Sequence, residues 1–242
     1  MTADRSASIV VLTGAGISAE SGLDTFRDPD GVWAQYRIEE VATPGAFREN
    51  PALVHDFYNM RRRQLFSPEV QPNAAHLALA GLERGWQGQF LLVTQNVDDL
   101  HERAGSRNLV HIHGELLKVR CVRSGRIDPC REDLGTPTKC ICCGEEGTLR
   151  PDVVWFGEIP LEMDRIQRAL SGCGIFVSVG TSGSVYPAAG FVEIARGGYS
   201  GRRQVRTVEL NLEPTAISPL FGEQTHGPAS RIVPAFVEKL LH

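Results

Sequence analysis

Short runs of hydrophobic residues recur along the chain, and most of them are rich in β-branched residues. Six runs predict strands: 9–12, 90–94, 109–113, 153–156, 175–179 and 205–212. Each run is continuous rather than alternating in polarity, which is typical of strands buried on both faces of a parallel sheet. The pattern therefore favours an α/β fold in which helices cover both faces of the sheet.

Segments with a helical pattern lie between these runs. Five of them predict helices: 51–66, 74–84, 163–170, 187–195 and 232–241. A strand, a glycine-rich turn and a helix in repetition predict a Rossmann-like, doubly wound parallel sheet.

Two segments interrupt this repetition and predict a smaller lobe. Residues 33–72 contain no clear strand and predict a helical insert. Residues 118–151 are rich in Cys, Gly, Pro and charged residues, and predict a zinc-ribbon-like module. The remaining segments form the Rossmann-like core of a single domain: 1–32, 73–117 and 152–242.

The composition is that of an ordinary globular protein. The chain has 242 residues, of which 42% are hydrophobic and 22% charged, so it is too apolar to be disordered. Its net charge of -4 argues against nucleic acid as a partner, because neutralising phosphates requires clustered Lys and Arg. No hydrophobic run approaches the roughly 18 residues of a membrane span, and the short polar N-terminus leaves no room for a signal peptide. We therefore expect a cytoplasmic protein with no membrane partner.

The cysteines predict a metal site. Five of the six lie between Cys121 and Cys143, and such clustering in a cytoplasmic chain indicates metal rather than disulfides. Cys140 and Cys143 form a C-x-x-C pair, whereas Cys121 is followed three residues later by Ser124. These three cysteines are the candidate ligands of a structural zinc ion, and the alternative is a degenerate site without metal. The fourth ligand is left open between two residues, Cys130 and Cys142.

A glycine-rich turn follows the first predicted strand. It reads G-x-G-x-x-A, and its candidate residues are Gly14, Ala15, Gly16, Ile17 and Ser18. Such glycines let the backbone approach a pyrophosphate, and the following helix N-terminus supplies N–H donors. The alternative is a glycine-rich turn that binds nothing.

The acidic residue of an ordinary dehydrogenase is missing from its usual place. That residue ends a second strand about 20 residues after the turn and binds the ribose. Glu39 and Glu40 lie at that distance, but no strand precedes them. Glu213, at the end of a late strand, is the better candidate. A nucleotide site is therefore predicted, and hydride transfer is not.

Polar segments follow several predicted strands. They are 95–99, 113–115, 156–158, 180–184 and 211–213. Any one of them could cap a helix. Ligands of open α/β sheets bind beyond the carboxyl ends of the strands, so their joint occurrence predicts one shared binding site.

His113 is the candidate general base. It ends a predicted strand just before Gly114, and by alternation it shares a strand face with His111. A lone histidine there is more often structural. Its place at the strand end favours a group that titrates near neutrality and accepts a proton.

Taken in order, these segments resemble a known family. The motifs are G-A-G-I-S-A-E-S-G from Gly14, Phe26-Arg27, Q-N-V-D from Gln95, His113-Gly114 and G-T-S from Gly180. They resemble the sirtuins, NAD-dependent protein lysine deacylases, and most of all the class III branch of sirtuin-5-like and CobB-like enzymes. The resemblance covers nearly the whole chain.

The resemblance implies an NAD site at the strand ends. The pyrophosphate is expected on 14–18, the adenosine ribose near Asn211 and Glu213, and the nicotinamide near Asn96 and Asp98. The other cofactor-binding residues that it implies are Glu20, Phe26, Arg27, Trp33, Gln95, Val97, Gly180, Thr181, Ser182, Leu212 and Ala229. One departure is G-L-D-T-F-R at 22–27 where family members often read G-I-P-D-F-R, which leaves the roles of its third and fourth residues open.

The resemblance also implies a mechanism. The acyl-lysine oxygen attacks C1′ of the nicotinamide ribose and expels nicotinamide, and His113 then acts as general base on a ribose hydroxyl. The products are free lysine and an O-acyl-ADP-ribose. The partners are acylated proteins or peptides, whose backbone is expected to add as a strand beside four residues: Val154, Phe156, Gly157 and Glu158.

Two residues of the helical insert predict which acyl groups are removed. Tyr58 and Arg61 share a helix face and match the Tyr-x-x-Arg pattern of sirtuins that remove succinyl, malonyl or glutaryl groups. A guanidinium and a phenol can hold a carboxylate at the end of an acyl chain. The alternative is that 61–63 is only a solvated basic run. We expect desuccinylation and demalonylation beside deacetylation.

Two other functions remain open. One is an ADP-ribosyltransferase that uses the same NAD site, and the other is a sensor that binds NAD or ADP-ribose without turnover. The sensor would have no need of a base at His113.

Overall fold

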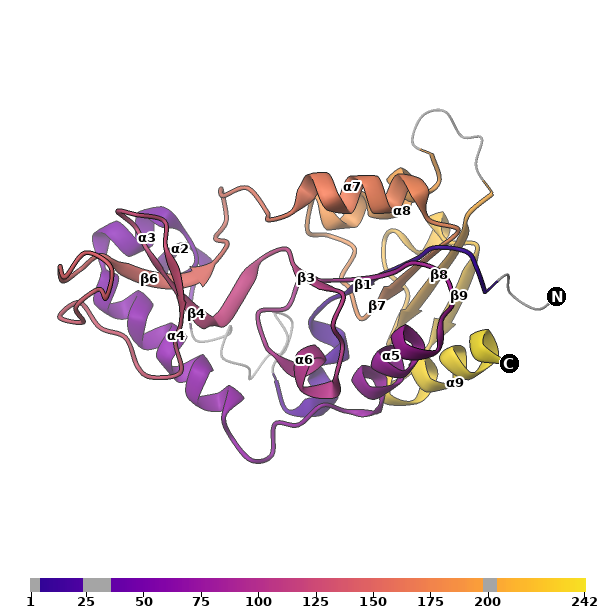
Figure 1. Cartoon of the computed structure of the whole chain (residues 1–242), viewed down its shortest axis with the longest axis horizontal. Coiled ribbons are helices and arrows are strands. Elements are labelled where there is room, and N and C mark those ends of the chain that lie inside the picture. The colour runs from indigo at the N-terminus through magenta and orange to yellow at the C-terminus, as the bar shows by residue number, and fades with distance from the viewer. Residues whose placement is uncertain (1–4, 24–35, 198–203) are drawn as a thin grey trace.

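The computed structural model describes residues 5–23, 36–197 and 204–242 (Figure 1). The strands are β1 (Ile9–Thr13), β2 (Phe90–Thr94), β3 (Leu109–His111), β4 (Gly114–Cys121), β5 (Ile127–Pro129), β6 (Leu149–Val153), β7 (Ile175–Val179), β8 (Arg206–Asn211) and β9 (Glu223–His226). The helices are α2 (Ile38–Val41), α3 (Pro44–Glu49), α4 (Pro51–Leu65), α5 (Ala74–Gly85), α6 (Leu100–Ala104), α7 (Met163–Gly172), α8 (Phe191–Ala195) and α9 (Ala229–Leu241). Short 3₁₀ turns are η1 (Ala15–Ile17), η2 (Ala19–Ser21), η3 (Ala188–Gly190) and η5 (Ser218–Leu220). Among these helices, none is long and apolar enough to cross a membrane.

Six strands form one parallel sheet in the order β3-β2-β1-β7-β8-β9. This is the strand order of the Rossmann fold, in which the direction of winding reverses between two central strands. Here the reversal falls between β1 and β7, which pair side by side from Ile9 and Ile175 onward. The predicted fold class is confirmed.

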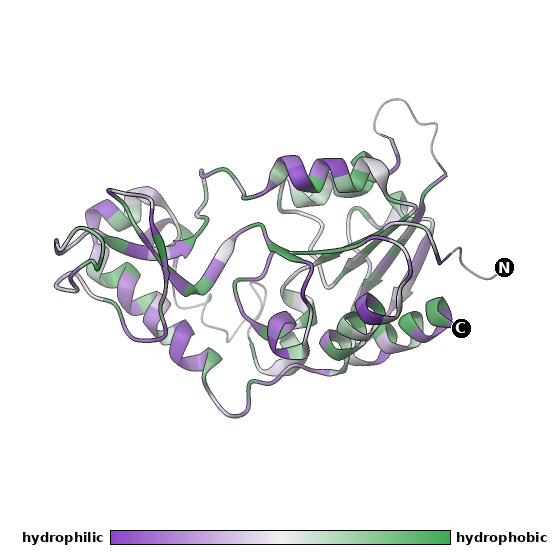
Figure 2. Cartoon of the chain, viewed as in Figure 1, coloured by the Kyte–Doolittle hydropathy of each residue, from purple (hydrophilic) through white to green (hydrophobic). Residues whose placement is uncertain are grey.

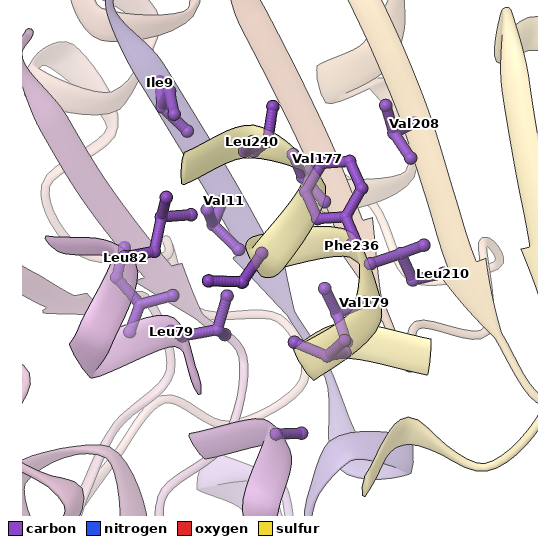
Figure 3. Close-up of a cluster of buried hydrophobic side chains, with 14 of the residues drawn as sticks. Ile9, Val11, Leu79, Leu82, Val177, Val179, Val208, Leu210, Phe236 and Leu240 are labelled. Carbon is purple, nitrogen blue, oxygen red and sulfur yellow. The ribbon is translucent and has the colours of Figure 1, made fainter. Parts of the chain in front are cut away.

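The sheet is buried on both faces. In β1, Ile9 and Val11 pack under α5 and α9, as Figure 3 shows, whereas Val10 and Leu12 pack under α7 and α8. Both sets are at most 3% exposed. β1 is therefore hydrophobic from Ile9 to Leu12. By contrast, α7 carries both hydrophilic and hydrophobic residues (Figure 2). Burial on two faces is the physical reason for the continuous runs.

A second, antiparallel sheet of order β5-β4-β6 lies with α2, α3 and α4 at one end of the molecule (Figure 1). Its hydrophobic contact with α4 runs through Tyr58, Leu116 and Val153. The Asn59 side chain adds two hydrogen bonds, donating to Leu134 O at 2.7 Å and accepting from Leu134 N at 2.8 Å. These bonds join α4 to the cysteine-rich segment.

Some predicted elements are wrong in detail. The run 153–156 is not a strand of the parallel sheet: β6 ends at Val153 and pairs antiparallel with β4. The strand predicted for 109–113 ends at His111, so alternation does not relate that residue to His113. The glycine-rich turn leads into η1 and η2 rather than an α-helix. The helix predicted for 187–195 is divided between η3 and α8.

Candidate active site

The glycine-rich turn lies at the point where the sheet reverses its winding. A Cβ atom on Gly14 or Gly16 would lie 2.8 Å from the carbonyl oxygen of Gly180, which follows β7. Gly180 itself has a φ of 60°, and its Cβ would lie 2.4 Å from Ile17 N. The three residues are therefore glycine because two loops of this chain touch one another. The expected approach of a pyrophosphate is not needed to explain them.

A buried polar cluster lies beside this turn. The Asn96 amide donates to Gly14 O at 3.2 Å and to Ser18 Oγ at 3.1 Å. Ser18 Oγ donates in turn to Asp98 Oδ2 at 3.1 Å. Burial raises the pKa of Asp98, against the opposing effect of hydrogen bonds from Leu100 N and Ser18. The structure thus brings together Ser18, Asn96 and Asp98, three of the predicted cofactor-binding residues.

His113 lies in the turn between β3 and β4, half-buried beside this cluster. Its Nδ1 is 3.0 Å from the carbonyl oxygen of Gln95. Because a carbonyl can only accept, Nδ1 carries the proton and Nε2 is left as a proton acceptor. Burial lowers the pKa of His113, with the Gln95 hydrogen bond opposing it. A neutral imidazole of fixed tautomer can serve as a general base.

The end of β6 holds the turn that carries His113. Gly114 has a φ of 76°, and a Cβ atom there would lie 2.1 Å from Asp152 O, so only glycine fits. Val154 N donates to His113 O at 2.8 Å. The predicted peptide-binding segment therefore begins at the residue bonded to the candidate base. Trp155, which follows it, is buried, and the next two residues, Phe156 and Gly157, are exposed.

His111 was not assigned a role from the sequence, yet it contacts the same segment of backbone. Its Nδ1 is 2.8 Å from Asn96 O, and its Nε2 is 2.8 Å from Glu102 Oε1. Both partners can only accept, so the ring makes both bonds when it is doubly protonated. Burial lowers the pKa of His111, but the Glu102 carboxylate, the hydrogen bond to Asn96 O and the charge of Glu115 together raise it overall. No sequence motif links His111 with Glu102, because the two residues lie on different elements, one at the end of β3 and the other on α6.

The predicted adenosine end of the site is held by the loops after β7 and β8. The Asn211 side chain donates to Thr181 O at 2.8 Å, and Ser182 Oγ lies 2.8 Å from Ser184 Oγ. Leu212 and Glu213 are exposed.

Glu20 contacts the start of α9, the helix that begins at Ala229. The Glu20 carboxylate accepts from the backbone N and the hydroxyl of Ser230, so α9 engages this side chain directly. Three other predicted cofactor residues, Phe26, Arg27 and Trp33, lie outside the described residues.

The basic run of α4 is not a solvated face. Arg62 is only 1% exposed and donates to Asn59 Oδ1 at 2.8 Å and to Leu116 O at 3.2 Å. Arg63 is exposed and pairs with Asp133. Arg61 is half-buried, and its positive charge is close enough to Tyr58 to oppose the rise in that residue's pKa. Arg61, Arg62 and Arg63 therefore lie in three different environments, although they are adjacent in sequence.

Four cysteines lie close enough together to hold a metal ion. The sulfur atoms of Cys121, Cys140, Cys142 and Cys143 all lie within 4.8 Å of one another. Four thiolates at this spacing fit a structural zinc ion. Of the two residues left open for the fourth ligand, Cys142 joins the group, and its Sγ lies 3.1 Å from Ser124 Oγ. Cys130 lies apart and donates to Glu132 O.

Comparison with known proteins agrees with this geometry. The Sir2 family model matches residues 14–187. An NAD-dependent protein deacylase of Salmonella typhimurium is 58% identical over 233 residues, which cover 96% of this chain and 84% of that protein. A crystal structure of a Sir2 homologue in complex with NAD is 40% identical, with a TM-score of 0.85 over 97% of this chain and 91% of that one. A Sir2 structure bound to a myristoylated histone peptide is 32% identical, with a TM-score of 0.73 over 96% and 90%. With a family match over most of its length and more than half of its residues shared with a relative, the chain belongs to the Sir2 family.

Proposed function

We propose that this chain is an NAD-dependent protein lysine deacylase. The observation that carries the proposal is the placement of His113, whose Nδ1 is fixed by Gln95 next to the buried Ser18–Asn96–Asp98 cluster. A base of defined tautomer at the carboxyl edge of a Rossmann-like sheet is what this chemistry requires. The 58% identity to a bacterial NAD-dependent protein deacylase supports the same function.

The donors and acceptors at the carboxyl edge suit NAD. The backbone N–H groups of Ala15, Thr181 and Ser182, which donate to no described residue, can bind phosphate or hydroxyl oxygens. The side chains of Asn96 and Asp98 suit a carboxamide. When bound, NAD would supply the electrophilic ribose carbon and the hydroxyl that receives the acyl group. His113 would take the proton of that hydroxyl at Nε2, while Gln95 holds the ring in position.

The substrates that we propose are acylated lysines of proteins or peptides. The exposed residues Phe156 and Gly157 lie two and three residues after Val154, which is bonded to His113, so a peptide laid along them would present its side chain to the base. A Sir2 relative that binds a myristoylated histone peptide supports this class of partner.

The acyl groups that we propose include succinyl and malonyl beside acetyl. Support comes from Tyr58, which is 2% exposed, and from Arg61, whose charge acts on it. An Arg–Tyr pair at the end of an acyl pocket would bind a carboxylate. Zinc would have a structural part, because Cys121 ends β4 and the other three cysteines lie in the segment between β5 and β6, away from the carboxyl edge of the large sheet. The cytoplasmic location stays a prediction from the sequence.

The test is a peptide assay with product analysis. Incubation with NAD and acetyl- or succinyl-lysine peptides should yield nicotinamide, free lysine and O-acyl-ADP-ribose by mass spectrometry. His113→Ala should lower turnover by about 100-fold or more. His226→Ala, a change at an exposed histidine of β9, should leave turnover unaltered. ADP-ribose attached to the peptide, or NAD binding without turnover, would refute the proposal.

A further inference from the structure

Trp155 lies between the proposed peptide-binding segment and the proposed acyl pocket. It follows β6 by two residues, is 3% exposed and packs in the same hydrophobic cluster as α4. Its indole Nε1 donates to the hydroxyl of Tyr58 at 2.9 Å. The residue thus connects two parts of the site that are far apart in sequence.

The bond between them fixes the role of the Tyr58 hydroxyl. An indole N–H can only donate, so the phenol oxygen must accept, and its own proton is directed elsewhere. Within the described part of the chain, no acceptor takes that proton. Burial raises the pKa of Tyr58 to about 12, against the opposing effects of Arg61 and Trp155, so the phenol stays protonated near neutral pH. A buried donor without a protein acceptor is suited to a ligand acceptor.

The indole is held firmly from its other sides. The guanidinium of Arg150 stacks over the Trp155 ring, 3.4 Å from the ring centroid. Arg150 also binds both carboxylate oxygens of Glu158, at 2.6 and 2.9 Å. Glu158 in turn accepts from the Trp155 backbone N at 2.8 Å. The direction of the indole N–H is therefore set by a charged clamp and not by ring packing alone.

We propose that Trp155 is a specificity-determining residue, which holds the Tyr58 hydroxyl so that its proton is directed at the carboxylate of an acidic acyl group. The inference rests on the proposed function, in which Tyr58 and Arg61 bind that carboxylate. A succinyl or malonyl group supplies the missing acceptor. An acetyl group does not, so the contact favours acidic acyl groups selectively.

The test is Trp155→Phe, which removes the N–H and keeps an aromatic ring. It should lower kcat/KM for a succinyl-lysine peptide by about tenfold, mainly through KM, and alter kcat/KM for the acetyl-lysine peptide by less than about twofold. Phe47→Leu is the matched control, because Phe47 packs against the same indole, with ring centroids 5.3 Å apart, and makes no bond to Tyr58. If Trp155→Phe does not fold, Arg150→Lys tests the same point, since it keeps the charge but loosens the stacked clamp.

A double-mutant cycle completes the test. In a Tyr58→Phe background, Trp155→Phe should have no further selective effect, because it acts through the hydroxyl. Equal losses on both substrates, or an undiminished selective loss in that background, would overturn the inference. If Tyr58→Phe and Arg61→Met also lower both activities equally, carboxylate binding itself fails. If Tyr58→Phe and Arg61→Met lower desuccinylation selectively and Trp155→Phe does not, the carboxylate site stands and only the role proposed for Trp155 is refuted.

Discussion

Glu102→Gln should destabilise the protein in acid more than in alkali. In the native protein, Glu102 accepts from His111 Nε2 at 2.8 Å, and the His111 side chain is 7% exposed. Gln keeps the shape and an acceptor oxygen but removes the charge that favours the imidazolium.

The size of the effect follows from exposure. A hydrogen bond between charged groups contributes about 1.5–3 kcal/mol when it is buried. The Glu102 side chain is 40% exposed, so solvent screening reduces this to about 1 kcal/mol. For a chain of this length, such a loss lowers Tm by about 2–4 °C.

The pH dependence has a definite sign. The pKa of His111 in the folded protein lies above its ordinary value of 6.5, so the bond contributes fully below that value. The contribution is lost as pH rises through the folded pKa, because a neutral ring has one proton for two acceptors. The difference between native protein and variant should therefore be about 1 kcal/mol near pH 5.5 and close to zero near pH 9.

Thermal unfolding of both proteins at the two pH values is the assay. Glu83→Gln is the control, because that carboxylate accepts from two backbone amides, Arg107 N at 3.0 Å and Asn108 N at 2.7 Å, and involves no histidine. Its loss of stability should be the same at both pH values. A Glu102→Gln difference that does not change with pH would refute the charged pair.

Three further outcomes are expected. Arg61→Met should lower desuccinylation by about tenfold or more and deacetylation little, whereas Arg63→Met, at an exposed residue paired with Asp133, should affect neither in peptide assays. Cys142→Ser should reduce the zinc content measured by elemental analysis, and Cys130→Ser should not, because only Cys142 lies with the other three thiols; equal zinc in both variants would contradict the four-cysteine site. Gly180→Ala should destabilise the protein by about 2 kcal/mol or more in denaturant unfolding, because its Cβ would lie 2.4 Å from Ile17 N at a φ of 60°; a variant as stable as the native protein would contradict this contact.

Most strands of the parallel sheet could be predicted from the sequence because they are buried on both faces. Their runs are hydrophobic almost throughout, as in β7, where every residue from Ile175 to Val179 is buried. β9 was missed because its residues, E-Q-T-H, are all exposed at the edge of the sheet. β4 was missed as well, since its residues alternate only partly between buried and half-buried positions. Hydrophobicity reveals strands that are buried on both faces and not strands that are exposed or half-buried.

The candidate site was predictable where a short motif carries it. The sequence pointed to Gly14–Ser18, Asn96, Asp98 and His113, and the structure brings these residues together at one edge of the sheet. It could not show that Glu20 binds the start of α9, because Ser230 lies 210 residues away. The division into a core and two insertions stays a prediction.

The sequence by itself determined the family, the central sheet, the candidate base and three of the four clustered thiols, because each depends on residues close together in the chain. Only the tertiary structure decided the rest. It selected Cys142 over Cys130, separated Arg61 from its buried neighbour Arg62, and set the indole of Trp155 against Tyr58. All three features depend on contacts between segments that are far apart in the sequence. The local pattern of hydrophobic and polar residues cannot show which distant side chain will contact a given group.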